Sequence, residues 1–153
     1  MTDILDNPVW AGLTGPHAHL AQVNGQAARY HPDVAPFATL AAGHDERAWA
    51  DLAALIGPAT VVAVTGVSGD PPAGWDRVER IPGVQMVATA LRDAPDPEAV
   101  RLRPADVPEM LDLVARTEPG PFRPRTIELG TYLGIRIGGR LAAMAGERLH
   151  PPG

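Results

Sequence analysis

Few residues in this sequence could do chemistry directly. His17 and His19 have the i, i+2 spacing that places two imidazoles on one face of a strand, an arrangement found in some metal sites. No third ligand lies close to them in the sequence, so no metal site is predicted. The chain of 153 residues has no cysteine, and all 13 of its basic residues are arginines. Catalysis by a thiolate or a lysine amine is therefore excluded, and no catalytic residue is predicted from spacing.

The composition indicates an ordinary globular protein. Hydrophobic residues make up 45% of the chain and charged residues 20%, which predicts a packed core. The net charge of -5 argues against a nucleic-acid surface, which needs clustered basic residues. No apolar run reaches the ~18 residues of a membrane span, and the acidic start Met1–Asp6 is unlike a secretory signal. We expect a cytoplasmic protein, of bacterial composition, that binds neither nucleic acid nor membrane.

The first 92 residues predict a small α/β region. A hairpin is expected from His17–Val23 and Gln26–Tyr30, because Asn24-Gly25 suits the positive φ angles of a tight turn. A helix is expected over Asp45–Ile56, and Gly57-Pro58 ends it. The predicted apolar face of this helix comprises Trp49, Leu52, Ala53 and Ile56.

Two strands are expected after that helix, followed by a linker. Thr60–Thr65 is β-branched and nearly all apolar, as in a strand that is buried on both faces. Gly83–Ala90 is the second expected strand. Asp93–Glu98 is acidic, rich in proline and without periodicity, so it is interpreted as a linker between residues 1–92 and residues 99–153.

The segment after the linker has a β-α-α-β-β pattern. Its expected elements are a strand at Val100–Arg103, a helix at Asp106–Arg116, a short helix ending near Gly130, and a hairpin of Tyr132–Ile137 and Leu141–Leu149 around Gly138-Gly139. The predicted apolar face of the long helix comprises Val107, Met110, Leu111 and Val114. Asp106 and Glu109 have the spacing of a capping box at its start.

Four stretches of this second segment resemble the opening of the GCN5-related N-acetyltransferases (GNAT), in particular their FR47-like subgroup. They are Val100–Met110 (VRLRPADVPEM), Arg116–Phe122 (RTEPGPF), Thr126–Gly134 (TIELGTYLG) and Gly139–Arg148 (GRLAAMAGER). The first stretch is similar to the family's first strand and first helix, and the second to the loop before the second helix. The third is similar to the second helix and second strand, and the fourth to the third strand. Residues 1–92 resemble the extra N-terminal region of this subgroup.

The resemblance implies an α/β fold of the α+β kind, with a mixed, mostly antiparallel sheet flanked by helices. It also implies acyl transfer from acetyl-CoA to an amine acceptor, either a small molecule or a peptide. This reaction needs a neutral amine, hydrogen-bond donors at the thioester oxygen and a clamp for the pyrophosphate of CoA. In the family the clamp is a loop of the form Arg/Gln-x-x-Gly-x-Gly/Ala that opens a helix after the fourth strand.

We expect this chain to lack that clamp. The sequence reaches His150–Gly153 where the resemblance places the start of the fourth strand, so a GNAT domain incomplete at the C-terminus is expected. Gln22–Ala27 (QVNGQA) matches the loop pattern literally, but Asn24-Gly25 predicts a hairpin turn and Pro32 follows too soon for a helix. Acetyl-CoA is thus expected as the cosubstrate of a complete protein and not as a tight ligand of these 153 residues.

The resemblance also suggests where an acceptor could bind. By position, Glu118–Arg125 corresponds to the loop that shapes the acceptor pocket. Phe122 is therefore expected to pack against the acceptor, and Arg123 or Arg125 to pair with an acidic group on it. Glu147 on the third strand is expected to orient the acceptor amine. The ordinary alternatives are a core position for Phe122 and solvent-exposed positions for the charged side chains.

More than one function fits these patterns. The first is an N-acyltransferase. This chain carries the acceptor side of that enzyme and is expected to be inactive on its own. The second is a degenerate acyltransferase-like module that binds a partner without catalysis, and the third is an unrelated small α/β protein. In each case the Leu141–Leu149 strand has no charge before Glu147, so its edge is expected to favour self-association.

Overall fold

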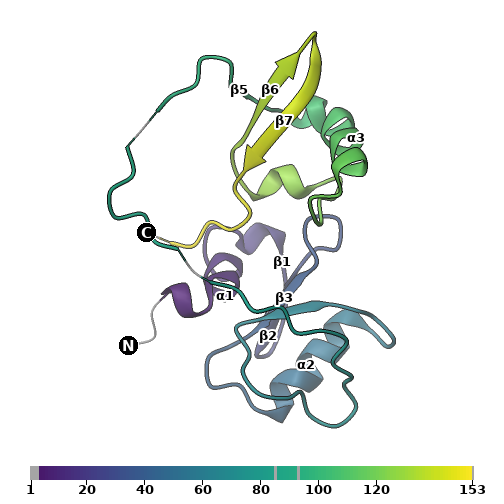
Figure 1. The fold of residues 1–153 in the computed structure, drawn as a ribbon. Coiled ribbons are helices and arrows are strands. Elements are labelled where there is room, and N and C mark those ends of the chain that lie inside the picture. The colour runs from purple at the N-terminus through teal and green to yellow at the C-terminus, as the bar shows by residue number, and fades with distance from the viewer. Residues whose placement is uncertain (1–3, 85, 93, 153) are drawn as a thin grey trace.

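The computed structural model describes residues 4–84, 86–92 and 94–152. It contains two β-sheets, each packed against helices. In Figure 1 the first sheet and helix α2 form the lower half, and the β6–β7 hairpin with helix α3 forms the upper half. Within the described ranges, no helix is long and apolar enough to cross a membrane.

The first sheet has four strands in the order in which they occur along the chain. The first three strands pair antiparallel, and the fourth pairs parallel with the third. The strands are β1 (Ala21–Asn24), β2 (Ala27–Tyr30), β3 (Phe37–Leu40) and β4 (Ala63–Thr65).

Alternation along β2 explains why helices cover both faces of this sheet. Ala28 and Tyr30 pack against helix α1 (Pro8–Leu13), whereas Ala27 packs against helix α2 (Glu46–Ile56). Successive side chains of a strand point to opposite faces, and two adjacent alanines let both helices approach the backbone closely. The first sheet is therefore buried between two helices at its centre.

The predicted hairpin is confirmed, with its turn one residue later than expected. Asn24 pairs with Ala27, so the two loop residues are Gly25 and Gln26, and Gly25 has a φ of +51°. Glycine adopts this left-handed conformation without the steric cost of a Cβ. The literal match to a phosphate loop, Gln22–Ala27, is therefore strand and turn.

His17 and His19 do not lie on a strand, so the prediction of a shared strand face was wrong. Ala18–Leu20 forms a short 3-10 helix that contains His19 and directly follows His17. His17 is buried and His19 is exposed. No group of three His, Cys, Asp or Glu among the described residues could hold a metal ion.

The predicted helix at Asp45–Ile56 is confirmed as α2. The carboxylate of Asp45 accepts hydrogen bonds from the backbone N–H groups of Arg47 and Ala48, at 3.0 and 3.3 Å. This is an N-cap, which satisfies donors that have no partner inside the helix. Gly57 ends the helix with a φ of +77°.

The apolar face of α2 differs from the prediction at one position. Ala53 is exposed, because the face that meets the sheet is rotated toward the preceding residues. The side chains that are buried or packed against the core are Ala48, Trp49, Leu52, Leu55 and Ile56.

Two predicted strands differ from the structure. Thr60–Thr65 forms only β4 (Ala63–Thr65), which is an exposed edge strand and not one buried on both faces. The buried strand next to it is β3 (Phe37–Leu40), which the sequence analysis missed. The described residues of Gly83–Ala90 form no strand, and Gln85 lies outside the described residues.

The long segment between the two sheets exposes large apolar side chains. Those with exposed fractions of 66% or more are Val78, Ile81, Val84, Met86, Val87 and Leu91. Residues 94–98 of the predicted linker are also exposed and lie in neither helix nor strand, and Asp93 lies outside the described residues.

The second sheet has the predicted order of elements. Strands β5 (Val100–Arg101), β6 (Tyr132–Ile137) and β7 (Arg140–Gly146) pair antiparallel in that order. Helix α3 (Val107–Thr117) packs on one face, and the short predicted helix is a 3-10 helix at Thr126–Leu129. The core between α3 and the sheet comprises Leu102, Met110, Leu113, Tyr132 and Leu141.

A β-bulge determines which residues of β7 face α3. Arg136 pairs with Leu141, whereas the residue before Arg136 pairs with Ala143, so Ala142 has no partner. One extra residue shifts the alternation of the strand. As a consequence, Leu141 and Met144 both pack in the core beneath α3 although they are three residues apart.

Asp106 and Glu109 do not form the predicted capping box. Both carboxylates pair instead with the guanidinium of Arg136, at 2.7 and 2.5 Å. These ion pairs connect the start of α3 to strand β6. On α3 itself, Leu113 is buried and Leu111 is only partly buried, so the predicted apolar face is rotated slightly.

Candidate functional site

A cavity of about 150 Å³ lies where the end of the β6–β7 hairpin meets α3 and the loop that follows α3. Its walls are mostly apolar, and one charged side chain contributes to them. The walls of ligand sites have the same character, mostly apolar with a few polar atoms that orient the ligand. The lining residues that matter here are Val114, Phe122, Tyr132, Met144, Gly146 and Arg148.

Two aromatic rings form one wall of the cavity. The ring of Phe122 stands edge to face with that of Tyr132, with the centroids 5.7 Å apart and an interplanar angle of 81°. Tyr132 pairs with Gly146 across the hairpin. A Cβ at Gly146 would overlap the Tyr132 ring. The missing side chain therefore lets the Tyr132 ring lie across β7 and reach Phe122.

The Tyr132 side chain is almost entirely buried. Only 6% of the residue is exposed, and its hydroxyl has no hydrogen-bond partner among the residues that the structure describes. In that part of the chain, every fully buried side-chain oxygen has a hydrogen-bond partner. Because the Tyr132 hydroxyl has none, it is not fully buried and reaches solvent. Burial is the largest effect on the pKa of Tyr132 and raises it. The charge of Arg148 lowers this pKa, and the charge of Glu147 raises it. The hydroxyl is therefore protonated near neutral pH and can donate or accept a hydrogen bond.

Arg148 is the charged residue of the cavity. Its guanidinium carbon lies 6.0 Å from the ring centroid of Phe37 on β3, within the range of a cation–π contact. No carboxylate among the described residues forms an ion pair with Arg148. Its positive charge is thus free to interact with a bound molecule.

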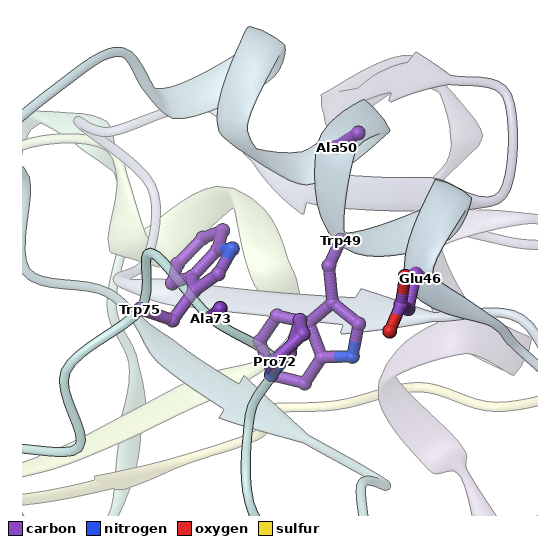
Figure 2. A pocket seen from close by; sticks show the side chains of 6 residues that line it. All are labelled: Glu46, Trp49, Ala50, Pro72, Ala73 and Trp75. Atoms are coloured by element: carbon purple, nitrogen blue, oxygen red, sulfur yellow. The ribbon is translucent and has the colours of Figure 1, made fainter.

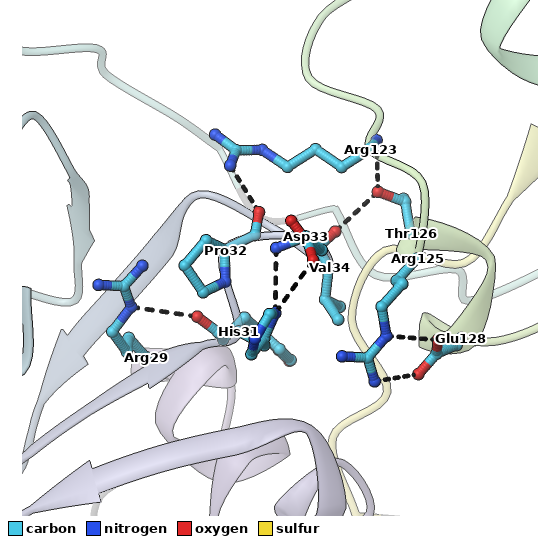
Figure 3. A network of polar contacts seen from close by, with 10 residues as sticks. Arg29, His31, Pro32, Asp33, Val34, Arg123, Arg125, Thr126 and Glu128 are labelled. Carbon is cyan, nitrogen blue, oxygen red and sulfur yellow. Dashed lines mark hydrogen bonds and ion pairs between the residues drawn. The ribbon is translucent and has the colours of Figure 1, made fainter.

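The loop that leads to the cavity is docked on the connection between β2 and β3 of the first sheet (Figure 3). Three successive backbone carbonyls accept hydrogen bonds from it: Pro32 from Arg123 Nη1 at 2.5 Å, Asp33 from the N–H of Arg125 at 2.9 Å, and Val34 from Thr126 Oγ1 at 2.7 Å. These bonds fix the loop immediately after Phe122. The first sheet therefore positions one wall of the cavity.

The four residues predicted to contact an acceptor are not brought together. Phe122 lines the cavity. The guanidinium of Arg123 reaches away from it to Pro32, and that of Arg125 forms two hydrogen bonds of 2.7 Å with Glu128 (Figure 3). Both arginine side chains therefore have partners within the protein.

Glu147 lies just after β7 and closes the base of the hairpin. Its carboxylate accepts a hydrogen bond of 2.5 Å from the backbone N–H of Thr131. This bond is the largest effect on the pKa of Glu147 and lowers it; burial acts in the opposite direction, and a contact with His150 at 3.3 Å lowers the pKa further. Glu147 thus holds the chain at the start of β6, next to Tyr132.

A larger hollow of about 230 Å³ lies on α2, away from the hairpin (Figure 2). Trp49 of α2 and Trp75 of a later loop meet there edge to face, with centroids 5.1 Å apart. Both rings pack against the apolar core under α2. Glu46, which also lines the hollow, lies in the first turn of α2, where a negative charge is favourable in any case. We interpret this hollow as a packing seam.

The sequence analysis missed the polar residues of the cavity. A two-residue turn at Gly138-Gly139 pairs Tyr132 with Ala145 if the strands are regular. The bulge at Ala142 moves Gly146 to that place instead. Because no sequence pattern marked the bulge, Tyr132 and Arg148 could not be placed beside Phe122. The one signal in the sequence for this site was the order of the four stretches that resemble the GNAT family.

Comparisons with known proteins show which family this fold belongs to. No family model matches the chain, and no curated protein sequence matches it. Among solved structures, the chain is similar to a protein from Novosphingobium aromaticivorans DSM 12444 that is assigned to the GNAT family as an acetyltransferase. The sequence identity is 33%, the TM-score is 0.68, and the similarity covers 99% of this chain and 67% of the other. With this identity over nearly its whole length, and with the mixed α+β architecture described above, the chain belongs to the GNAT family of acyltransferases.

Proposed function

We propose that this chain carries the acceptor side of a GNAT N-acyltransferase of the FR47-like subgroup, which transfers an acetyl group from acetyl-CoA to an amine. The cavity between Phe122, Tyr132 and Met144 is the place where the amine acceptor binds. Phe122 contacts the acceptor directly, as expected from the resemblance. The acceptor is a small organic amine or the end of a peptide.

The position of the cavity is the observation that carries this proposal. Its walls come from α3, the loop at residues 118–125 and the ends of β6 and β7. These are the elements that resemble the acceptor side of the family. Apolar walls hold the carbon skeleton of an acceptor, and the Tyr132 hydroxyl at the cavity offers a hydrogen bond to its polar group.

Three of the predicted site residues have positioning roles in this account. Arg123 holds the loop on the N-terminal sheet. Arg125, at the end of that loop, pairs with Glu128 of the 3-10 helix that follows it. Glu147 holds Thr131 at the start of β6. A misplaced binding wall lowers catalytic efficiency even when the reacting groups are intact.

The described residues do not fit the pyrophosphate of CoA. Gln22–Ala27 is the literal match to the family's loop, and it forms the β1–β2 hairpin. A pyrophosphate site needs backbone N–H groups that converge at the start of a helix. We therefore assign no residue of this chain to CoA and propose that these 153 residues bind acetyl-CoA weakly or not at all.

Methionine-methyl NMR tests the acceptor site directly. The chain has four methionines. Met144 lines the cavity, and Met110 is fully buried in the core beside it. Titration of protein carrying carbon-13 methionine methyl groups with small primary amines should shift the Met144 signal and leave the Met110 signal in place. The Phe122→Ala variant should respond at higher amine concentrations.

The absence of any Met144 response to amines, in a protein whose Met110 signal shows a folded core, would rule out the acceptor site. That outcome favours the second function, a binding module without catalysis. The lack of a pyrophosphate fit is the observation behind this second function. Release of thiol from acetyl-CoA in the presence of an amine, above the rate without protein, would favour the enzyme and show that our assignment for CoA is wrong.

A further inference from the structure

We infer that Arg148 makes the cavity specific for amines that carry an anionic group, such as a carboxylate, next to an apolar side group. This inference rests on the proposed function and names the chemical class of its acceptor. An amino acid with an apolar side chain has this combination of groups.

The charge of Arg148 is the first argument. Among the described residues, Arg116, Arg125 and Arg136 each pair with a carboxylate of the protein. Arg148 has no such partner, although Glu147 is adjacent in sequence. The carboxylate of Glu147 is held by the Thr131 N–H on one oxygen and lies near His150 with the other. A cation without a carboxylate partner, on a residue that lines an apolar cavity, attracts an anionic group of the ligand.

The position of the guanidinium is the second argument. The contact with the Phe37 ring at 6.0 Å restricts where the long Arg148 side chain can lie. A restricted side chain loses less conformational entropy when it binds a ligand. A guanidinium also presents paired N–H donors that match the two oxygens of a carboxylate. Arg148 is thus suited to recognise a carboxylate rather than a neutral group.

The remaining walls define the other part of the ligand. Val114, Phe122 and Met144 are apolar, and Tyr132, which carries a hydroxyl, lines the same space. An apolar side group of the acceptor fits against these walls. A positive charge nearby also favours the neutral form of an amine, which is the form that attacks a thioester. Arg148 therefore serves both the recognition of the acceptor and its readiness to react.

A matched pair of probes isolates the carboxylate. L-phenylalanine and 2-phenylethylamine have the same ring and amine and differ by one carboxylate. Both should shift the Met144 methyl signal, and the dissociation constant of L-phenylalanine should be about tenfold lower, as one charge-assisted hydrogen-bonded pair provides. Met110 serves as the internal control because it is fully buried.

Substitutions of Arg148 complete the test. In Arg148→Gln the two probes should bind with equal affinity, and in Arg148→Lys part of the preference should return. Arg140→Gln is the matched control, because Arg140 is also an exposed arginine but lies at the start of β7, whereas Arg148 follows the end of that strand. It should retain the full preference for L-phenylalanine.

The outcomes separate this inference from the proposed function. If both probes shift Met144 with equal affinity in the unmodified protein, the inference about Arg148 is overturned and the acceptor site stands. A tenfold preference that persists in Arg148→Gln also overturns it. If neither probe shifts Met144, both the inference and the proposed acceptor site are wrong.

Discussion

His17 Nε2 lies 2.8 Å from the carbonyl oxygen of Leu129, 112 residues further along the chain. A carbonyl can only accept a hydrogen bond, so Nε2 carries the proton and Nδ1 accepts from the hydroxyl of Tyr30, 2.7 Å away. The neutral imidazole therefore satisfies both partners. His17 connects the first sheet with the segment that enters β6, where the candidate acceptor cavity lies.

The stability of the protein should fall as the pH drops below about 6.5, the ordinary pKa of histidine. The pKa of His17 is lowered, chiefly by burial. The charges of His150 and His19 also lower it, whereas the bond to Leu129 and the charge of Glu147 raise it by less than burial lowers it. The folded protein thus binds this proton more weakly than the unfolded chain. The stabilisation is complete above the unfolded pKa and is lost as the pH falls toward the folded one. Urea unfolding at pH values between about 7.5 and 5.5 measures this.

The control is His17→Ala. At about pH 7.5 it should lower the free energy of unfolding by about 1–3 kcal/mol, because Tyr30 and Leu129 lose their partner. Its midpoint should then depend less on pH than that of the unmodified protein. The same pH dependence in both proteins would contradict the assignment to His17.

Thr126→Val should destabilise the protein by about 1–3 kcal/mol, because a buried carbonyl is left without a donor. The Thr126 hydroxyl donates to Val34 O and accepts from the N–H of Arg123, both at 2.7 Å. Thr117→Val is the matched control, since the Thr117 hydroxyl bonds to a carbonyl of its own helix on an exposed surface. Equal effects of the two substitutions on the urea midpoint would show that the docking of the loop is not important for stability.

The elements that the sequence predicted well have local signals. Helix α2 carries its cap at Asp45 and its stop at Gly57, so both ends could be read from neighbouring residues. The burial of strands could not be read in this way. Thr60–Thr65 has the composition of a central strand, but its part in the sheet lies at an edge, because Phe37–Leu40 occupies the inner position. Which strands pair is determined by distant residues, and composition does not report it.

The candidate site shows the same limit. The resemblance pointed to the loop of Phe122, which lines the cavity, because the order of elements is visible in the sequence. Arg123 and Arg125 share that loop, but their side chains bond to Pro32 and Glu128. The partner of Arg123 lies 91 residues away in the sequence, which no local pattern indicates.

Gly146→Ala should destabilise the protein by about 1–3 kcal/mol and abolish the Met144 response to amines, because the new Cβ displaces the Tyr132 ring. In a Tyr132→Ala background the same substitution should cost much less, since the ring is absent. A double-mutant cycle on the free energy of unfolding measures this coupling. Additive effects of the two substitutions would mean that the glycine does not act through Tyr132.

The β7 edge should cause concentration-dependent association. No strand within the described part of the chain pairs with the outer side of β7, and no charge occurs between Leu141 and Gly146. On the face of the sheet away from α3, Ile137 is 71% exposed. Ala143→Glu places a charge on β7 and should shift sedimentation toward the monomer.

Ala115→Glu is the control for this substitution, because Ala115 is an exposed alanine of α3, away from the β7 edge. It should associate like the unmodified protein. A monomer at all concentrations before any substitution, or equal association of both variants, would exclude the β7 edge as the contact.

The central claim, that the acceptor binds beside Phe122 and Met144, is tested most directly by intermolecular nuclear Overhauser effects between L-phenylalanine and the protein. The account predicts contacts from the ligand's ring protons to the Met144 methyl group and the Tyr132 ring, which both line the cavity. Contacts to Trp49 and Trp75 instead, which line the larger hollow on α2, would contradict it.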